Sequence, residues 1–109
     1  MNEESERRLA RNEALFRETN EAIERGQWPD DPGKLVRFRC ECSRVDCNEA
    51  VEITLGLYEE VREFPRRFVV ASGHEMPQIE TVVSQEGAYT IVEKQDAAGE
   101  TATATDPRH

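Results

Sequence analysis

Long apolar runs are missing from this sequence of 109 residues. No stretch approaches the roughly 18 apolar residues that a membrane-spanning helix requires. Residues 1–5 have neither the basic nor the apolar region of a secretory signal peptide. We therefore expect a cytoplasmic protein without a membrane segment. Hydrophobic residues make up only 37% of the chain and charged residues 34%, so a core of this size requires an additional staple.

Basic residues are also scarce. The chain has 14 Lys and Arg against 23 Asp and Glu, which gives a net charge of -9. Such a chain lacks the basic footprint of a protein that binds nucleic acid through bulk electrostatics. The middle of the chain is a partial exception, because residues 34–70 carry as many bases as acids. Its bases are Lys34, Arg37, Arg39, Arg44, Arg62, Arg66 and Arg67. We interpret these bases as balancing the negative charge of nearby carboxylates and of the cysteines at residues 40–47. The less favoured alternative is that they bind nucleic acid, in which case the protein would be a nucleic-acid-associated factor.

Only three cysteines and two histidines are present, and all three cysteines lie within residues 40–47. Thiolates this close can converge on one Zn²⁺ ion, for which sulfur and imidazole nitrogen are suitable ligands. His74 follows Gly73 after an apolar run, where a chain reversal can present its imidazole, whereas His109 ends a polar tail. The sequence therefore predicts a zinc site made of Cys40, Cys42, Cys47 and His74.

Other uses of these cysteines remain open. A Cys40–Cys47 or Cys42–Cys47 disulfide would leave one thiol over, and the odd count argues against it. Three unrelated buried thiols are a further alternative, as is a catalytic zinc with water in its fourth position.

Motifs of familiar enzymes are absent. The chain has no glycine-rich phosphate loop, no Gly-x-Ser-x-Gly and no zinc-deaminase signature. Glu41, Asp46 and Glu75 lie beside the predicted ligands and could act as a general base on zinc-bound water. The alternative is that these carboxylates support the ligands or are solvated. Because the predicted site uses His74 as a ligand, His109 in the polar tail is the only histidine left for acid–base catalysis. We therefore expect a protein that is not an enzyme.

Residues 3–25 predict one helix, which Gly26 would end. Leu9, Phe16 and Ile23 recur every seven residues and form a narrow apolar stripe. Two outcomes are open: the stripe docks on the rest of the chain, or it contacts a protein partner or a second copy. Residues 27–34, including the only tryptophan, Trp28, predict a linker.

Alternating apolar residues predict strands at 35–40 and 51–55, paired through the cysteine loop. Thr54 is a possible N-cap for a short helix at 57–64 with Leu57, Val61 and Phe64 on its buried side. A strand at 68–71 and a hairpin of 79–83 with 89–92 follow. Residues 95–109 contain no large apolar side chain and are expected to be a disordered tail.

Several segments together resemble a group of small bacterial proteins, common in actinobacteria, that has no established activity. They are residues 11–18, Cys40-Glu41-Cys42, residues 58–62, Gly73-His74-Glu75 and residues 92–94. The similarity spans residues 7–94 and implies a cytosolic setting.

These patterns together predict an α+β fold with a helix at residues 1–26, a linker at 27–34 and a zinc-stapled domain with a small antiparallel sheet at 35–94. The expected function is that of a non-catalytic zinc-binding module for protein interaction or regulation. A thiol-based redox or zinc sensor is the main alternative, because clustered thiolates can be oxidised.

Overall fold

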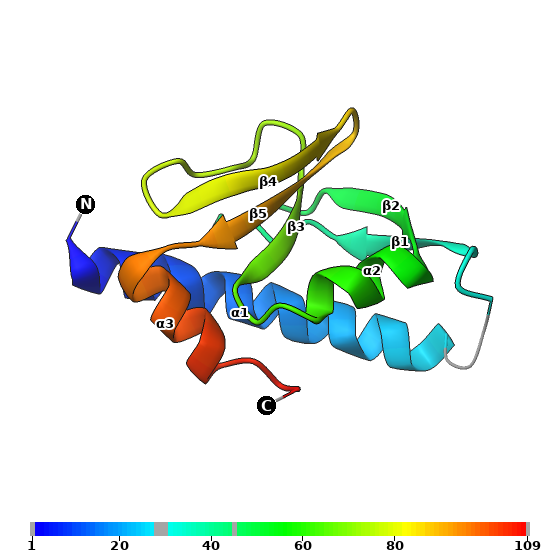
Figure 1. The fold of residues 1–109 in the computed structure, drawn as a ribbon, viewed down its shortest axis with the longest axis horizontal. Helices are drawn as coiled ribbons and strands as arrows, with labels where there is room; N and C mark the ends of the chain where they lie inside the picture. Colours follow the sequence, from blue (N-terminus) through cyan, green and yellow to red (C-terminus); the bar gives the residue numbers. More distant parts are fainter. Residues whose placement is uncertain (1, 28–30, 45, 109) are drawn as a thin grey trace.

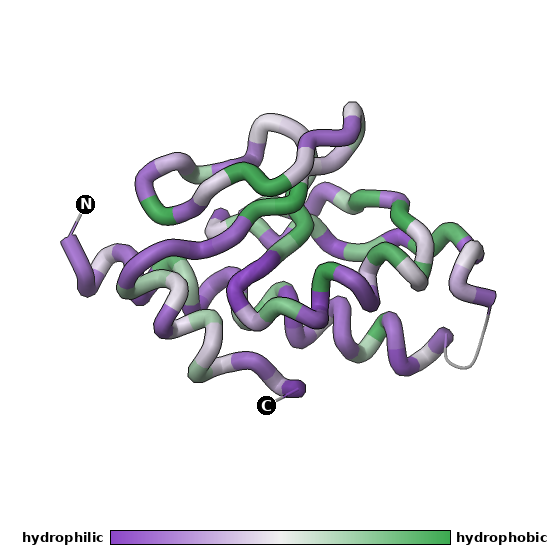
Figure 2. Tube along the Cα trace, viewed as in Figure 1, coloured by the Kyte–Doolittle hydropathy of each residue, from purple (hydrophilic) through white to green (hydrophobic). Residues whose placement is uncertain are grey.

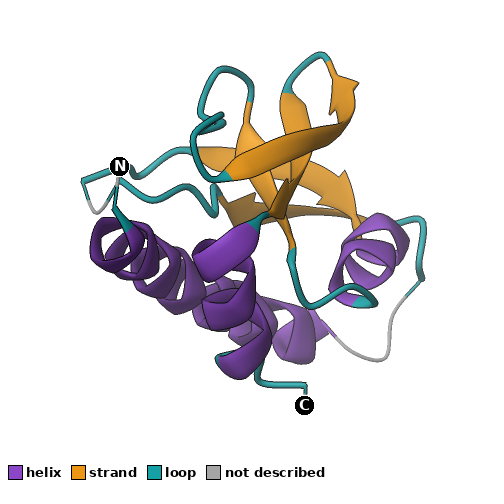
Figure 3. Cartoon of the chain, turned by 60° about the vertical axis from the view of Figure 1, so that its left-hand side comes forward, coloured by secondary structure: helices purple, strands orange, loops and turns teal. Residues whose placement is uncertain are grey.

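The computed structural model describes residues 2–27, 31–44 and 46–108. Its strands gather on one side of the molecule and its helices on the other (Figure 3). This confirms the α+β fold with a long N-terminal helix and small antiparallel sheets. Trp28, in the predicted linker, lies outside the described residues.

Helix α1, Glu3–Gln27, runs along the molecule below the strands in the view of Figure 1. It extends one residue past Gly26, which therefore does not end it. Three glutamates in its first turn and Arg25 in its last turn interact favourably with the helix dipole and stabilise the helix. The tube of Figure 2 is hydrophilic along most of α1. Five of the seven buried residues of α1 are polar or charged, so the helix packs on the domain largely through polar side chains.

The predicted hairpin around the cysteine loop is present. Strand β1, Leu35–Arg39, pairs antiparallel with β2, Ala50–Thr54. Val36, Phe38, Val51 and Ile53 are buried, as the alternation predicted. Thr54 caps helix α2, Leu55–Arg62, by accepting a hydrogen bond of 3.1 Å from the backbone N–H of Leu57.

The strands form two sheets, whereas the sequence predicted one. Strands β3 (Arg67–Ala71), β4 (Glu80–Glu86) and β5 (Tyr89–Lys94) form an antiparallel sheet in the order β3-β5-β4. The main core contains residues of both sheets and of α2. Within it, the rings of Phe38 and Tyr58 stack with their centroids 4.3 Å apart. The stripe predicted on α2 is wrong at Phe64, which is 43% exposed, and Tyr58 is buried instead.

The expected disorder of residues 95–109 is wrong. Residues Asp96–Ala104 form helix α3, which packs along α1. Small residues allow this close approach: Ala97, Ala98 and Ala102 are buried. A Cβ on Gly99 would lie 2.9 Å from the carbonyl oxygen of Lys94. Small size, rather than apolar bulk, therefore makes this segment suitable for packing.

Buried charges fasten α1 and the C-terminal segment to the domain. Arg17 on α1 donates hydrogen bonds to the carbonyl oxygens of Pro65 (2.7 Å) and Ala102 (2.8 Å). Arg62 on α2 pairs with Glu21 at 2.7 Å and with Asp106. These groups are almost fully buried, so each depends on its partners for compensation.

Lys94 at the end of β5 makes a similar buried cluster with Glu13 on α1 and Glu80 on β4. The predicted stripe is less deeply buried than these charges. Leu9 and Ile23 are only partly buried where they pack against the core, and Phe16 lies under the guanidinium of Arg39. The sequence left open whether the stripe docks on the rest of the chain or contacts a partner. In the structure it packs on the rest of the chain.

Candidate metal centre

Each of the two sheets contributes to one cluster of metal-ligating side chains. Cys40 directly follows β1, Cys42 and Cys47 lie in the loop between β1 and β2, and His74 lies after β3. Gly73 has φ of 86°, a left-handed conformation that glycine adopts without strain. The turn closes with a 3.0 Å hydrogen bond from the His74 N–H to the Ala71 carbonyl. It brings the imidazole back toward the cysteine loop.

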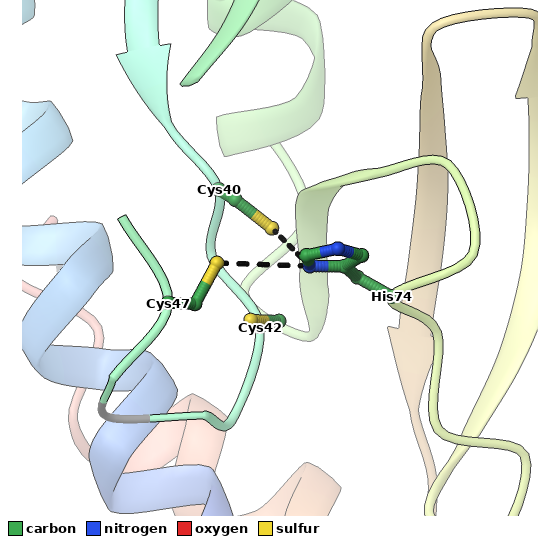
Figure 4. Close-up of side chains that lie close together, drawn as sticks. All are labelled: Cys40, Cys42, Cys47 and His74. Carbon is green, nitrogen blue, oxygen red and sulfur yellow. Dashed lines mark hydrogen bonds between the residues drawn. The ribbon is translucent and has the colours of Figure 1, made fainter. Parts of the chain in front are cut away.

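The four predicted residues come together, with one ligand atom of each lying within 4.8 Å of all the others. Figure 4 shows the side chains of Cys40, Cys47 and His74 pointing toward one another beside Cys42. The His74 Nδ1 atom lies 3.5 Å from the Cys40 Sγ and 3.6 Å from the Cys47 Sγ. In a tetrahedral site with bonds of about 2.3 Å to sulfur and about 2.0–2.1 Å to nitrogen, the edge from sulfur to nitrogen is about 3.5 Å. These two distances fit a metal ion at the centre.

Nδ1 is the imidazole atom that faces the thiols. The other ring nitrogen, Nε2, lies 3.6 Å from a carboxylate oxygen of Glu49, the residue directly before β2. A carboxylate near the second nitrogen of a ligating histidine orients the ring and makes it a better ligand. Glu49 could not be predicted from the sequence, because its position opposite His74 depends on the turn after β3.

The thiols are shielded from water. Cys40 is fully buried, and Cys42 and Cys47 are 1% and 8% exposed. The backbone N–H of Ala71 donates to the Cys40 Sγ at 3.1 Å, an interaction that stabilises a thiolate. No cysteine is in a disulfide, so the bridges considered above are not formed.

Thiol ionisation within the cluster is uneven in the absence of a cation. A hydrogen bond from the Cys40 thiol lowers the pKa of Cys42 to about 4. The same bond, together with burial, raises the pKa of Cys40, and burial raises the pKa of Cys47. A cation bound by all three sulfurs therefore has to displace the protons of Cys40 and Cys47.

Glu41 faces away from the thiols into the core. One of its oxygens accepts hydrogen bonds from the Asn20 amide (2.8 Å) and the Tyr58 hydroxyl (3.2 Å). The other accepts from the Val69 N–H at 2.9 Å, and the Glu41 N–H donates to the Val69 carbonyl at 2.8 Å. Burial raises the pKa of this carboxyl, while the bonds from Asn20 and Val69 lower it. Glu41 therefore anchors the peptide between Cys40 and Cys42 and is not free to act as a general base.

The other two carboxylates that lie beside the predicted ligands in sequence differ in their exposure. Asp46 is exposed, and Glu75 is partly buried with one oxygen that has no hydrogen-bond partner among the described residues. Of the basic residues, Arg39 supports the loop directly. Its guanidinium stacks on Phe16, 4.0 Å from the ring centroid, and donates to the Cys47 carbonyl. Arg39 therefore links Cys47 to Phe16 on α1.

No protein family model, curated protein or solved structure matches the chain. The resemblance to a bacterial group therefore stays a prediction, and any function has to be argued from the site itself. Among the described residues, no helix is both long and apolar enough to cross a membrane.

Proposed function

We propose that this protein is a small, non-catalytic zinc-binding module of the cytoplasm that acts by binding another protein. The observation that supports it is the cluster of Cys40, Cys42, Cys47 and His74, with edges from sulfur to nitrogen of 3.5 and 3.6 Å. Three thiolates and one imidazole are a common donor set of structural zinc sites. In this proposal the ion fastens the β1–β2 hairpin to the β3–β5–β4 sheet.

A structural role fits the donor count better than a catalytic one. Catalytic zinc keeps one position open for water, whereas this cluster offers four protein ligands. Glu41, which lies between Cys40 and Cys42 in sequence, is held by three hydrogen-bond donors. We therefore propose no reaction for this site.

Metal analysis of the purified chain tests the proposal. We expect about one zinc ion per chain, since a complete Cys3His set binds one ion. Cys42→Ser should lose the metal and much of the stability, because structural zinc supplies on the order of 10 kcal/mol to small modules. Ser43→Ala, at the adjacent position, should keep the metal. Reduced protein that contains no metal after expression with ample zinc would overturn the proposal.

A thiol-based sensor is the second candidate function, because three oxidisable sulfurs surround one site. The burial of Cys40 and Cys42 favours the structural role instead, since redox sensors depend on accessible thiolates. Peroxide treatment followed by zinc measurement separates the two. Rapid, reductant-reversible release at peroxide concentrations that leave ordinary structural sites intact would favour the sensor.

The partner contact first considered was the stripe of Leu9, Phe16 and Ile23. In the docked helix these side chains are partly buried, so such a contact requires α1 to leave the domain. Deleting residues 1–26 tests that route. A remainder that keeps its zinc and melts cooperatively, but no longer captures a partner or self-associates, would support the helix as the binding element. We expect the remainder to unfold, because Arg62 and Lys94 would lose buried carboxylate partners on α1.

Nucleic-acid association has the least support. Several of the central bases are engaged within the chain: Arg62 pairs with Glu21 and Asp106. Arg67 pairs with Glu93. A protein partner therefore suits this acidic chain better.

A further inference from the structure

A groove opens between helix α2 and the exposed face of strands β4 and β5. Its volume is about 510 Å³. Apolar side chains from both walls line it, namely Leu57, Val61, Phe64, Val83, Tyr89 and Ile91. Phe64 and Val83 are each 43% exposed. Large apolar side chains left open to water at a concave surface are typical of a binding site.

Acidic side chains surround this apolar floor. Glu60, Glu63 and Glu86 belong to the groove and are exposed. None of the described residues forms an ion pair with them. Arg67 is the one base among the described residues that line the groove. It is already engaged, with Glu93 at 3.1 Å and the Phe64 ring 3.9 Å from its guanidinium carbon. The rim therefore presents three uncompensated negative charges around an apolar surface.

Charge complementarity indicates the kind of occupant. A basic partner is attracted by this rim and by the net charge of -9 on the whole chain. A large apolar side chain between the basic ones would cover Phe64 and Val83, the type of central contact that contributes most to binding. A second copy of this acidic chain would instead bring like charges together.

Docking through side chains is more consistent with this surface than addition of a strand. Strand β4 is at the edge of its sheet, but its register shifts between Val82 and Ser84. Such a bulge interrupts the regular row of backbone groups that strand addition requires.

We propose that the groove between α2 and the β4–β5 hairpin binds a short basic segment of a partner protein, in which lysine or arginine residues flank a large apolar side chain. This inference rests on the proposed function and names the chemistry of its partner. None of the four candidate metal ligands lines the groove, so loss of the metal and loss of peptide binding can be measured separately.

Selection from a random-peptide display library against the zinc-loaded full chain tests the proposal. We expect enrichment of peptides that place Lys or Arg on both sides of Phe, Leu or Trp. A synthetic peptide of the enriched sequence, labelled with fluorescein, then serves as the probe in anisotropy titrations. Glu60→Gln with Glu86→Gln should weaken its binding by up to about fivefold per carboxylate, and more at low salt than at high salt. Phe64→Ser should weaken it by about tenfold or more.

The matched control is Glu18→Gln with Glu52→Gln, which removes the same charge from exposed positions outside the groove. It should leave the affinity within about twofold, since the charges lie away from the groove. Equal losses in the two charge variants, or enrichment of acidic peptides or of none, would overturn the proposal. So would self-association that depends on Phe64, because the occupant would then be a second copy. Zinc content and thermal melts of every variant distinguish a lost groove from a lost metal site.

Discussion

Asp106→Ala tests whether the C-terminal segment is part of the folded domain. Asp106 is 3% exposed and pairs with Arg62, which is 1% exposed and also binds Glu21 at 2.7 Å. The carboxylate accepts, in addition, a 3.0 Å hydrogen bond from the Arg108 backbone N–H. Replacement by alanine leaves the buried guanidinium with a single carboxylate.

The expected cost follows from this geometry. Removing one partner of a buried ion pair destabilises a protein by about 3–5 kcal/mol. Because Glu21 still pairs with Arg62, we expect the lower end, about 3 kcal/mol. That is a large part of the roughly 5–15 kcal/mol that stabilises a typical domain. It corresponds to a fall in melting temperature of roughly 10–20 °C for a domain of this size.

Glu100→Ala is the matched control. It too removes an ion pair of the C-terminal segment, in this case with Arg7 on α1 at 3.4 Å, but the side chains of Arg7 and Glu100 are 38% and 61% exposed. A surface pair of this kind contributes about 0–1 kcal/mol. Urea denaturation of both variants gives the two differences in the free energy of unfolding, provided that the dependence of this free energy on urea concentration (the m-value) is unchanged. If Asp106→Ala costs no more than Glu100→Ala, the C-terminal segment is not docked, and the disordered tail that the composition predicts is the better description.

Three further outcomes are expected. His74→Ala should lose zinc whereas His109→Ala should keep it; the reverse result in metal analysis would show that the wrong histidine was chosen. Burial raises the pKa of Glu13 from 4.5 to about 7 although Lys94 lowers it. The folded state therefore holds this proton more tightly than the unfolded state, and the stability from this group is complete below pH 4.5 and declines as the pH rises to 7. Glu13→Gln should remove a decline on the order of 3 kcal/mol over that range, and urea titrations in which both proteins keep the same pH dependence would contradict this. Gly99→Leu should destabilise the protein by a few kcal/mol, because its Cβ would lie 2.9 Å from the Lys94 carbonyl oxygen; an unchanged thermal melt would show that α3 packs differently.

The strands and the metal cluster could be predicted because their signals are local. Alternation in β1 and β2 specifies which face is buried, and three cysteines within eight residues have to lie close together. His74 was identified by elimination, since only one other histidine exists. The structure places it at the site through the turn at Gly73.

Which helix residues are buried was harder to predict, because their burial depends on partners far along the chain. Glu13, Arg17 and Glu21 have the composition of a solvated helix face, yet each is at most 5% exposed. Their partners lie on β5, α2 and the C-terminal segment, so no local pattern reveals them. Helix α3 escaped prediction for a different reason, since its alanines pack by being small and provide little apolar signal.

Asn20 links the position of α1 to the geometry of the cysteines. Its side chain exchanges two 2.7 Å hydrogen bonds with the backbone of Arg39, as a neighbouring strand would, and donates a third to Glu41. A shift of α1 along its axis by one turn, about 5.4 Å, would break all three bonds beside Cys40 and Cys42. Two processes that look separate, the docking of a helix and the capture of an ion, thus share one alignment. Under the proposed function, we therefore expect the affinity for zinc to depend on whether α1 is in register.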